Sequence, residues 1–266
     1  MQVSTLSKDK GIIFTLQINM KPLIDVHTHS IASGHAYSTL VEMVREAQNR
    51  GLKIFGITEH TPALPGACHS IYFRNLHVVP RQWGDMRLLL GAELNIINSK
   101  GDIDLEDEFF PMLDIRIAGI HKLCWENGTA EENTEGMIRV IQNPWINIIS
   151  HPGDGTAELN FEPIVIAAKE HNTLLEINNS SLNPVRGKTH KSIPNNIEIL
   201  NLCKKYEVPV ILGSDAHITF DIANYDNILP LLNETEFPEE LIINDKPNAF
   251  IKLLEKKGNE LLSSKN

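Results

Sequence analysis

Short apolar segments recur along the chain about every 30 residues, and amphipathic segments separate most of them. The apolar segments are rich in β-branched and aliphatic side chains, which is typical of buried strands. Strands that alternate with helices at this spacing indicate βα units and a parallel sheet. The predicted strands span residues 23–28, 53–58, 87–94, 115–120, 145–150, 173–178 and 208–213.

Helical signals lie between these strands. Thr39 and Glu42 form a capping-box pattern, apolar residues follow on one face, and Gly51 marks the stop. Pro230 lies inside another predicted helix, and we expect it to end or kink that helix. Pro247 suits the first turn of the last one. These further helices are predicted at 131–142, 161–171, 194–206, 219–232 and 247–257.

Seven βα units predict an α/β fold in which the sheet closes into a barrel, one unit short of the common eight. An open, doubly wound sheet is the alternative. We expect one domain over residues 20–258, because no low-complexity linker interrupts the alternation. Residues 1–19 are expected to be an N-terminal extension, and residues 259–266 a polar C-terminal tail.

Composition and charge narrow the function classes. The chain has 266 residues, of which 42% are hydrophobic, so it can bury a sizeable core. A net charge of −10 argues against a general nucleic-acid or membrane-surface binder. Cys68, Cys124 and Cys203 are scattered, which disfavours a disulfide framework and makes a reducing, cytoplasmic location the default. No apolar run is long enough for a membrane span.

Candidate metal ligands follow six of the seven predicted strands, and most of the 11 histidines of the chain are among them. Side chains two apart on a strand point the same way, so His27 and His29 can grip one ion together. The carboxyl ends of barrel strands converge on one mouth, where such side chains meet. The candidate ligands are His27, His29, His35, His60, Glu93, His121, His151, Asp215 and His217.

This ligand set mixes nitrogen and oxygen without thiolate, which suits Zn²⁺, Mn²⁺ or Fe²⁺. Nine ligands are too many for one ion, so two or three ions fit the count, with a carboxylate bridging. Three divalent ions with two carboxylates leave a charge of about +4, which a phosphate ester balances better than a neutral amide.

Several motifs occur in order over residues 21–258: D-x-H-x-H, S-x-H-A-Y-S-T, G-I-T-E-H, G-x-E, A-G-x-H, I-I-S-H-P-G, L-E-I-N-N-S-S and L-G-S-D-A-H. In this combination the chain resembles the PHP (polymerase and histidinol phosphatase) family, most closely its bacterial YcdX-type phosphatases. The resemblance implies a distorted (β/α)7 barrel that binds three divalent metal ions. Zinc is the expected metal, and manganese and iron are the alternatives. It assigns His27, His29, Glu93 and Asp215 to the first ion, Glu93, His121 and His151 to the second, and His35, His60 and His217 to the third.

The chain departs from the family pattern at two positions. Glu59 stands where relatives usually carry Asp, and Lys122 stands where they often carry an acidic residue. Glu59 has the opposite strand parity to His60, so we expect it to be a hydrogen-bond partner and not a ligand. By the same parity argument, Lys122 is expected on the opposite face from His121.

Substrate contacts are expected from loops over the mouth of the barrel. Arg81, which matches the family pattern, and Arg74 lie in the long excursion 61–86. Arg186, with Lys188, lies in the loop after the sixth strand. A solvated surface position is the alternative to phosphate contact for each of these residues, and Arg81 and Arg186 are the predicted substrate-binding residues.

The sequence therefore predicts a metal-dependent phosphoesterase that hydrolyses a small phosphomonoester by attack of a metal-bound hydroxide. Its partner would be a small anionic phosphate-ester substrate, with no membrane and no strong nucleic-acid signal, and a homo-oligomer is compatible with the sequence. One alternative is an amidohydrolase-type metal hydrolase, which also opens with H-x-H on a first barrel strand. Another is a non-catalytic PHP accessory module, although such modules usually lose ligands.

Overall fold

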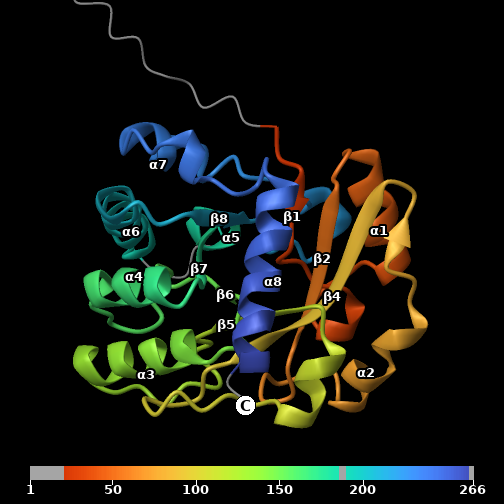
Figure 1. Cartoon of the computed structure of the whole chain (residues 1–266), viewed down its shortest axis with the longest axis horizontal. Helices are drawn as coiled ribbons and strands as arrows, with labels where there is room; N and C mark the ends of the chain where they lie inside the picture. The colour runs from red at the N-terminus through yellow and green to blue at the C-terminus, as the bar shows by residue number, and fades with distance from the viewer. Residues whose placement is uncertain (1–20, 186–189, 264–266) are drawn as a thin grey trace, which may run out of the picture.

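A parallel sheet of seven strands forms the centre of the computed structural model, which describes residues 21–185 and 190–263 (Figure 1). The strands lie in the order β1-β2-β4-β5-β6-β7-β8, and each pairs in parallel with the next. All seven predicted strands are confirmed, with ends that differ by a few residues. Their bounds are β1 Ile24–Asp25, β2 Ile54–His60, β4 Met86–Asn95, β5 Ile115–Gly119, β6 Ile148–Ile149, β7 Leu174–Asn178 and β8 Val210–Gly213.

The first and last strands meet just beyond their carboxyl ends. Thr28 and Ala216 form a parallel bridge. The Asp215 amide donates to the His27 carbonyl at 2.9 Å, and the His29 amide donates to the Ala216 carbonyl at 2.9 Å. These contacts curl the sheet into a nearly closed barrel. The predicted barrel is therefore confirmed, and the open-sheet alternative is wrong.

The excursion between β2 and β4 contains structure that the sequence did not predict. A short helix, α2 (Ile71–Arg74), runs into the 3₁₀ helix η2 (Asn75–Val78). A two-residue strand, β3 (Gln82–Trp83), then pairs antiparallel with the start of β4. Two residues are too few to show an alternating pattern. The excursion thus carries the chain from the carboxyl end of β2 back to the amino end of β4.

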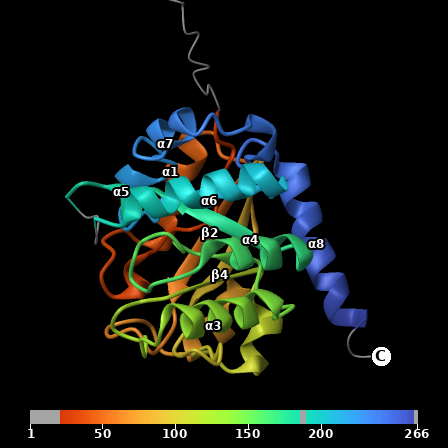
Figure 2. The same ribbon diagram turned by 90° about the vertical axis from the view of Figure 1, so that its left-hand side faces the viewer.

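Helices cover the outside of the sheet. Figures 1 and 2 show α3, α4 and α6 in a row on one side, α1 beside β2 and β4 on the other, and α8 as a separate, steeply inclined helix. The predicted capping box at Thr39 and Glu42 is present, and Thr129 and Glu132 form a second one. The helices span α1 Leu40–Asn49, α3 Ala130–Gln142, α4 Phe161–Glu170, α5 Asn179–Leu182, α6 Ser192–Tyr206, α7 Leu229–Glu234 and α8 Pro247–Ser263.

The predicted helix at 219–232 is wrong as a single element. A 3₁₀ turn, η4 (Thr219–Asp221), comes first, and α7 begins only at Leu229. Pro230 lies in the first turn of α7, so it begins a helix instead of ending one. The first turn tolerates proline because no partner exists there for a backbone N–H. The remaining 3₁₀ helices are η1 Ile31–Ser33, η3 Asp107–Met112 and η5 Glu239–Leu241.

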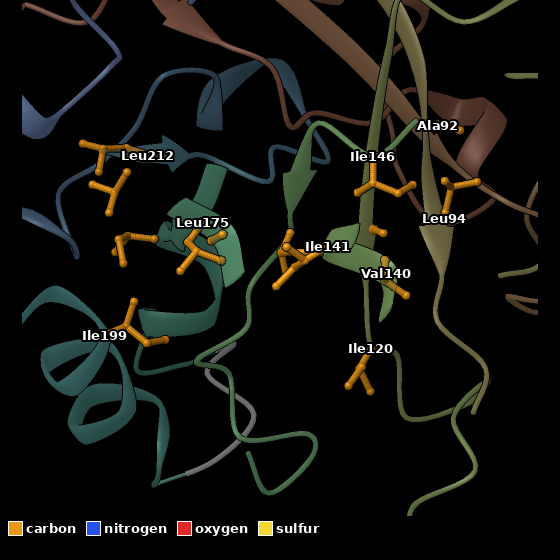
Figure 3. Close-up of a cluster of buried hydrophobic side chains, with 14 of the residues drawn as sticks. Ala92, Leu94, Ile120, Val140, Ile141, Ile146, Leu175, Ile199 and Leu212 are labelled. Carbon is orange, nitrogen blue, oxygen red and sulfur yellow. The ribbon is translucent and has the colours of Figure 1, made fainter. Parts of the chain in front are cut away.

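Apolar side chains are buried on both faces of the sheet. Neighbouring residues of one strand point to opposite faces, so Leu175 of β7 joins the core beneath the outer helices and Leu174 joins the barrel interior. Figure 3 shows Leu175 and Leu212 facing Ile199 of α6. Phe250 of α8 packs into the interior cluster. Burial on both faces explains the continuous apolar runs of the sequence. None of the described helices is long and apolar enough to cross a membrane.

Candidate metal centre

The carboxyl edge of the sheet gathers the polar side chains that the sequence singled out. In the parallel register of β2 and β4, His60 lies directly opposite Glu93. His27 and His29 follow β1, and Asp215 follows β8 across the closure of the barrel. Strand ends that converge in this way hold side chains from distant parts of the sequence in one place.

Glu93 lies at the middle of this cluster and is completely buried. Its Oε1 lies 3.3 Å from Nε2 of His27, 3.3 Å from Nε2 of His121 and 2.9 Å from Nε2 of His151. Its Oε2 lies 3.5 Å from Nε2 of His29 and 2.9 Å from Nδ1 of His60. One carboxylate thus contacts five imidazoles, as a bridging ligand would.

Asp215 and the remaining histidines occupy the outer part of the cluster. Oδ1 of Asp215 lies 3.6 Å from Nε2 of His27 and 3.4 Å from Nε2 of His29. His217 Nε2 lies 3.0 Å from His35 Nε2. Two imidazole nitrogens at this distance repel one another unless a proton or a metal ion lies between them. The structure therefore brings together all nine residues that the sequence singled out.

The donor atoms of this cluster fit metal ions. Within the described residues, Nε2 of His27, Nε2 of His29 and Oε2 of Glu93 are buried and make no hydrogen bond. Unpaired polar atoms are costly in a protein interior, and metal coordination removes that cost. Donor atoms within 4.8 Å of one another form the trios His27–His29–Glu93, His29–His60–His217 and His60–Glu93–His121.

The electrostatics of the cluster suit metal coordination. Burial raises the pKa of Glu93, but His27, His121 and His60 more than compensate and hold that pKa well below its ordinary value. Burial and the neighbouring imidazoles of His60 and His217 lower the pKa of His29 well below its ordinary value. Burial lowers the pKa of His27, but Glu176, Glu93 and Asp215 more than compensate and raise it well above its ordinary value, so metal binding there would displace a proton. An ionised carboxylate and a neutral imidazole are the forms that bind divalent metals.

Glu176, whose role the sequence analysis missed, lies behind the candidate ligands and orients two of them. Oε1 of Glu176 lies 2.7 Å from Nδ1 of His27, and its Oε2 accepts from the His151 amide at 2.8 Å. Asn178 donates to the same Oε2 at 3.0 Å. Gly213 leaves room for this carboxylate, because a Cβ there would lie 1.6 Å from Glu176 Oε1. Glu176 could have been found from the sequence, because it is a carboxylate within an otherwise apolar strand and a buried carboxylate needs a buried partner.

Glu59 supports the opposite side of the cluster through hydrogen bonds with two serines. Its side chain accepts from the Oγ atoms of Ser30 and Ser33, the latter at 2.5 Å. Ser33 Oγ also lies 3.0 Å from Nδ1 of His29 and accepts from the His60 amide at 3.0 Å. Glu59 is therefore a hydrogen-bond partner behind the cluster, on the side that its strand parity predicts.

Two of the candidate ligands have unusual backbone conformations. His151 has a φ of 34° and Asp215 a φ of 54°. Non-glycine residues rarely adopt positive φ, and such strained residues concentrate at functional sites. The strain falls at the turns that aim these two side chains into the cluster.

The structure does not bring the predicted substrate arginines to the cluster. Arg81 donates to Asp114 at 2.6 Å and to the carbonyls of Leu76 and Val79, so the expectation that it lies over the mouth is wrong. The cause is the returning excursion, which has reached the amino end of the sheet by residue 81. Arg74 pairs with Glu108 at 2.8 Å. Arg186 lies outside the described residues.

A cavity of about 730 Å³ opens onto the cluster, and its lining includes His35, His60, Glu93 and Lys122. The expectation that Lys122 faces away from His121 is wrong. β5 ends at Gly119, and residues 122–124 form a turn, so strand alternation no longer applies there.

Comparisons with known proteins agree with this geometry. The PHP domain family model matches residues 25–208. A protein named "Probable phosphatase" from Clostridium novyi (strain NT) is 46% identical over 241 residues, which cover 90% of this chain and 97% of that protein. Another of the same name, from Caldicellulosiruptor bescii, is 45% identical over 238 residues, which cover 90% and 98%.

Among solved structures, the histidinol phosphate phosphatase of Lactococcus lactis, complexed with zinc, L-histidinol and phosphate, has a similar fold. Its TM-score is 0.57 at 20% sequence identity, and the match covers 82% of this chain and 95% of that one. At this identity the likeness concerns the fold alone.

Proposed function

Because the chain belongs to the PHP domain family, we propose that it is a metal-dependent hydrolase of phosphate esters whose substrate is a small phosphomonoester. The observation that carries this proposal is Glu93, a buried carboxylate in contact with five imidazoles. The relatives named "Probable phosphatase", which match over 90% of the chain, support the same class of reaction.

The nine cluster residues would hold three divalent ions, and zinc fits the mixed nitrogen and oxygen donors best. The zinc in the Lactococcus lactis structure supports this choice. In this arrangement Glu93 bridges two ions, and the outer histidines hold the third. The proposed sets are His27, His29, Glu93 and Asp215, then Glu93, His121 and His151, then His35, His60 and His217.

Bound divalent ions would supply an activated water at neutral pH and neutralise the charge of a phosphate. The protein contributes the orientation of the ligands. Glu176 fixes the His27 ring by its contact with Nδ1, and Ser33 does the same for His29. Orienting groups of this kind keep ligand geometry constant and make the imidazole a better donor.

Charge balance favours a phosphate ester over a neutral amide. Seven imidazoles and two carboxylates carry a formal charge of about −2, which does not neutralise several divalent ions. An anionic substrate removes this excess of positive charge. The cavity of about 730 Å³ admits a small molecule, and the phosphate in the Lactococcus lactis complex is consistent with such a ligand.

The test is hydrolysis of 4-nitrophenyl phosphate by the full chain, first stripped of metal and then loaded with Zn²⁺, Mn²⁺ or Fe²⁺. We expect the metal-loaded wild-type protein to release phosphate and the metal-free protein to release none. The Glu93→Ala variant, treated with the same metals, should also release none. Bis(4-nitrophenyl) phosphate and an N-acyl amide serve as competing substrates. Faster cleavage of the amide would favour the amidohydrolase alternative, and no cleavage of any ester would favour an accessory module.

A further inference from the structure

The wall of the cavity above the metal centre is apolar. Away from the ligand cluster, most of the described residues that line it have apolar side chains or a large apolar body. Tyr37 is 79% exposed and Leu123 is 74% exposed, although large apolar side chains usually avoid water. Exposed apolar side chains that gather at a cavity mark a binding surface. The apolar lining consists of Tyr37, Leu64, Pro65, Leu123 and Ile218.

Outside the ligand cluster, the charged side chains of the described wall are of one sign only. Lys122 is the one Lys or Arg among the described residues that line the cavity. The carboxylates in that described lining are Glu93 and Asp215, and both belong to the ligand cluster. Among the described residues, the wall therefore offers a cation to the non-phosphate part of a bound ester and no free carboxylate for an ammonium group.

Lys122 is well placed to act on a ligand at the mouth. It directly follows His121, whose Nε2 lies 3.3 Å from Glu93 Oε1, so its backbone is fixed close to the metal centre. Its side chain is exposed, and it is absent from the ion pairs among the described residues. A lysine on a flexible stem can follow a ligand into the cavity.

We propose that this site selects phosphomonoesters whose alcohol part is apolar and carries no positive charge, and that Lys122 is the residue that determines this specificity. The inference rests on the proposed phosphatase function. An apolar alcohol part gains by covering the exposed side chains of the wall. An ammonium group there meets Lys122 without a compensating carboxylate, and like charges a few ångströms apart repel.

Three aryl phosphates with similar phenol leaving groups separate the effect of substrate charge from the effect of leaving-group reactivity. These are 4-ethylphenyl phosphate, its 2-aminoethyl analogue and its 2-carboxyethyl analogue; hydrolysis of each adds the oxygen of water to phosphorus and releases the phenol. 4-(2-Hydroxyethyl)phenyl phosphate supplies a polar, uncharged group on the same type of phenol leaving group. For the zinc-loaded wild-type chain, we expect kcat/KM to be about tenfold lower for the aminoethyl ester than for the ethyl ester. We expect the hydroxyethyl ester to be the poorer of the two uncharged substrates.

The decisive variants change the charge at position 122. Lys122→Met keeps the apolar stem and should bring the aminoethyl and carboxyethyl esters to within about threefold of one another. Lys122→Glu should invert the preference, so that the ratio of aminoethyl to carboxyethyl kcat/KM rises by about 30-fold over wild type. Lys252→Glu in α8 makes the same change of net charge on an exposed lysine outside the cavity lining and should leave that ratio unchanged.

Binding of the matching non-hydrolysable phosphonates, measured by isothermal titration calorimetry, separates this inference from the proposed function. If the phosphonates bind with the expected charge preference but no ester is hydrolysed, the inference stands and the proposed function fails. If the esters are hydrolysed but Lys122→Glu leaves the ratio unchanged, the inference is overturned. Equal binding of all three phosphonates to wild type and Lys122→Glu also overturns it.

Discussion

The carboxylate of Glu176 lies 2.7 Å from Nδ1 of His27, while Nε2 of the same ring lies 3.3 Å from Oε1 of Glu93. Because an ionised carboxylate only accepts hydrogen bonds, Nδ1 carries a proton, and a metal ion that binds His27 would do so at Nε2, in place of a proton, on the side of the cluster. Glu176 thus fixes both the tautomer and the orientation of a candidate metal ligand. Carboxylates in this position are part of the design of metal sites.

Glu176→Gln tests this positioning role. Glutamine keeps an acceptor for His27 but loses the negative charge and turns an amide toward the His151 N–H. We expect the affinity for Zn²⁺ to fall by about 10- to 100-fold, with the fold retained. Competition with a chelating dye measures the affinity, and circular dichroism checks the fold. Glu170→Gln, on the exposed end of α4, is the matched control and should have wild-type affinity.

Ser33→Ala tests the opposite side of the cluster. Ser33 Oγ contacts His29 Nδ1, Glu59 Oε2 and the His60 amide, at 3.0, 2.5 and 3.0 Å. Its loss removes this partner from His29 Nδ1 and from the His60 amide, and leaves Glu59 Oε2 with the Ser30 amide as a donor, so the free energy of unfolding should fall by about 1–3 kcal/mol and metal binding should weaken about tenfold. Urea unfolding and dye competition measure the two effects. Ser99→Ala, which changes a half-buried serine in a loop, is the control. If Ser33→Ala were as stable as this control and bound metal as tightly, the proposed role of Ser33 would be contradicted.

The positions of the candidate ligands could be predicted because most of them lie at or just beyond the carboxyl end of an apolar strand, and a parallel barrel brings these strand ends together. His60 and Glu93 lie 33 positions apart in the sequence, yet strand register alone sets them opposite one another. Residues in irregular segments could not be placed in this way. Lys122 lies in a turn beyond β5, where no periodicity indicates direction, and Arg81 lies on a returning excursion whose path depends on the hairpin of β3 with β4.

Arg81→Met tests the structural role that replaces the predicted substrate contact. The guanidinium donates to Asp114 at 2.6 Å and to the carbonyls of Leu76 and Val79 at 2.6 and 2.7 Å. We expect the variant to lose about 1–3 kcal/mol of unfolding free energy while kcat/KM for 4-nitrophenyl phosphate stays within about twofold of wild type. Arg45→Met, on the exposed face of α1, should change neither quantity. A large loss of kcat/KM without a loss of stability would instead support a substrate-binding role for Arg81.

Glu93→Ala and His35→Ala separate the proposed bridging ligand from a peripheral one. Glu93 contacts five imidazoles, whereas His35 is exposed at the mouth and lies 3.0 Å from His217. Removal of the buried carboxylate leaves closely spaced cations with less negative charge between them. We expect Glu93→Ala to lose at least two ions and all activity, and His35→Ala to lose about one ion and part of the turnover. Equal metal loss in the two folded variants would contradict the bridging role.

The most direct test of the account is the number of metal ions that the wild-type chain binds. The chain would be stripped with a chelator, reloaded with excess Zn²⁺, passed through a desalting column and analysed by inductively coupled plasma mass spectrometry against protein concentration. The nine converging ligands predict three zinc ions per chain. A count of two or fewer that does not rise with more Zn²⁺ would contradict the trinuclear centre, and a count near zero would contradict a metal site altogether.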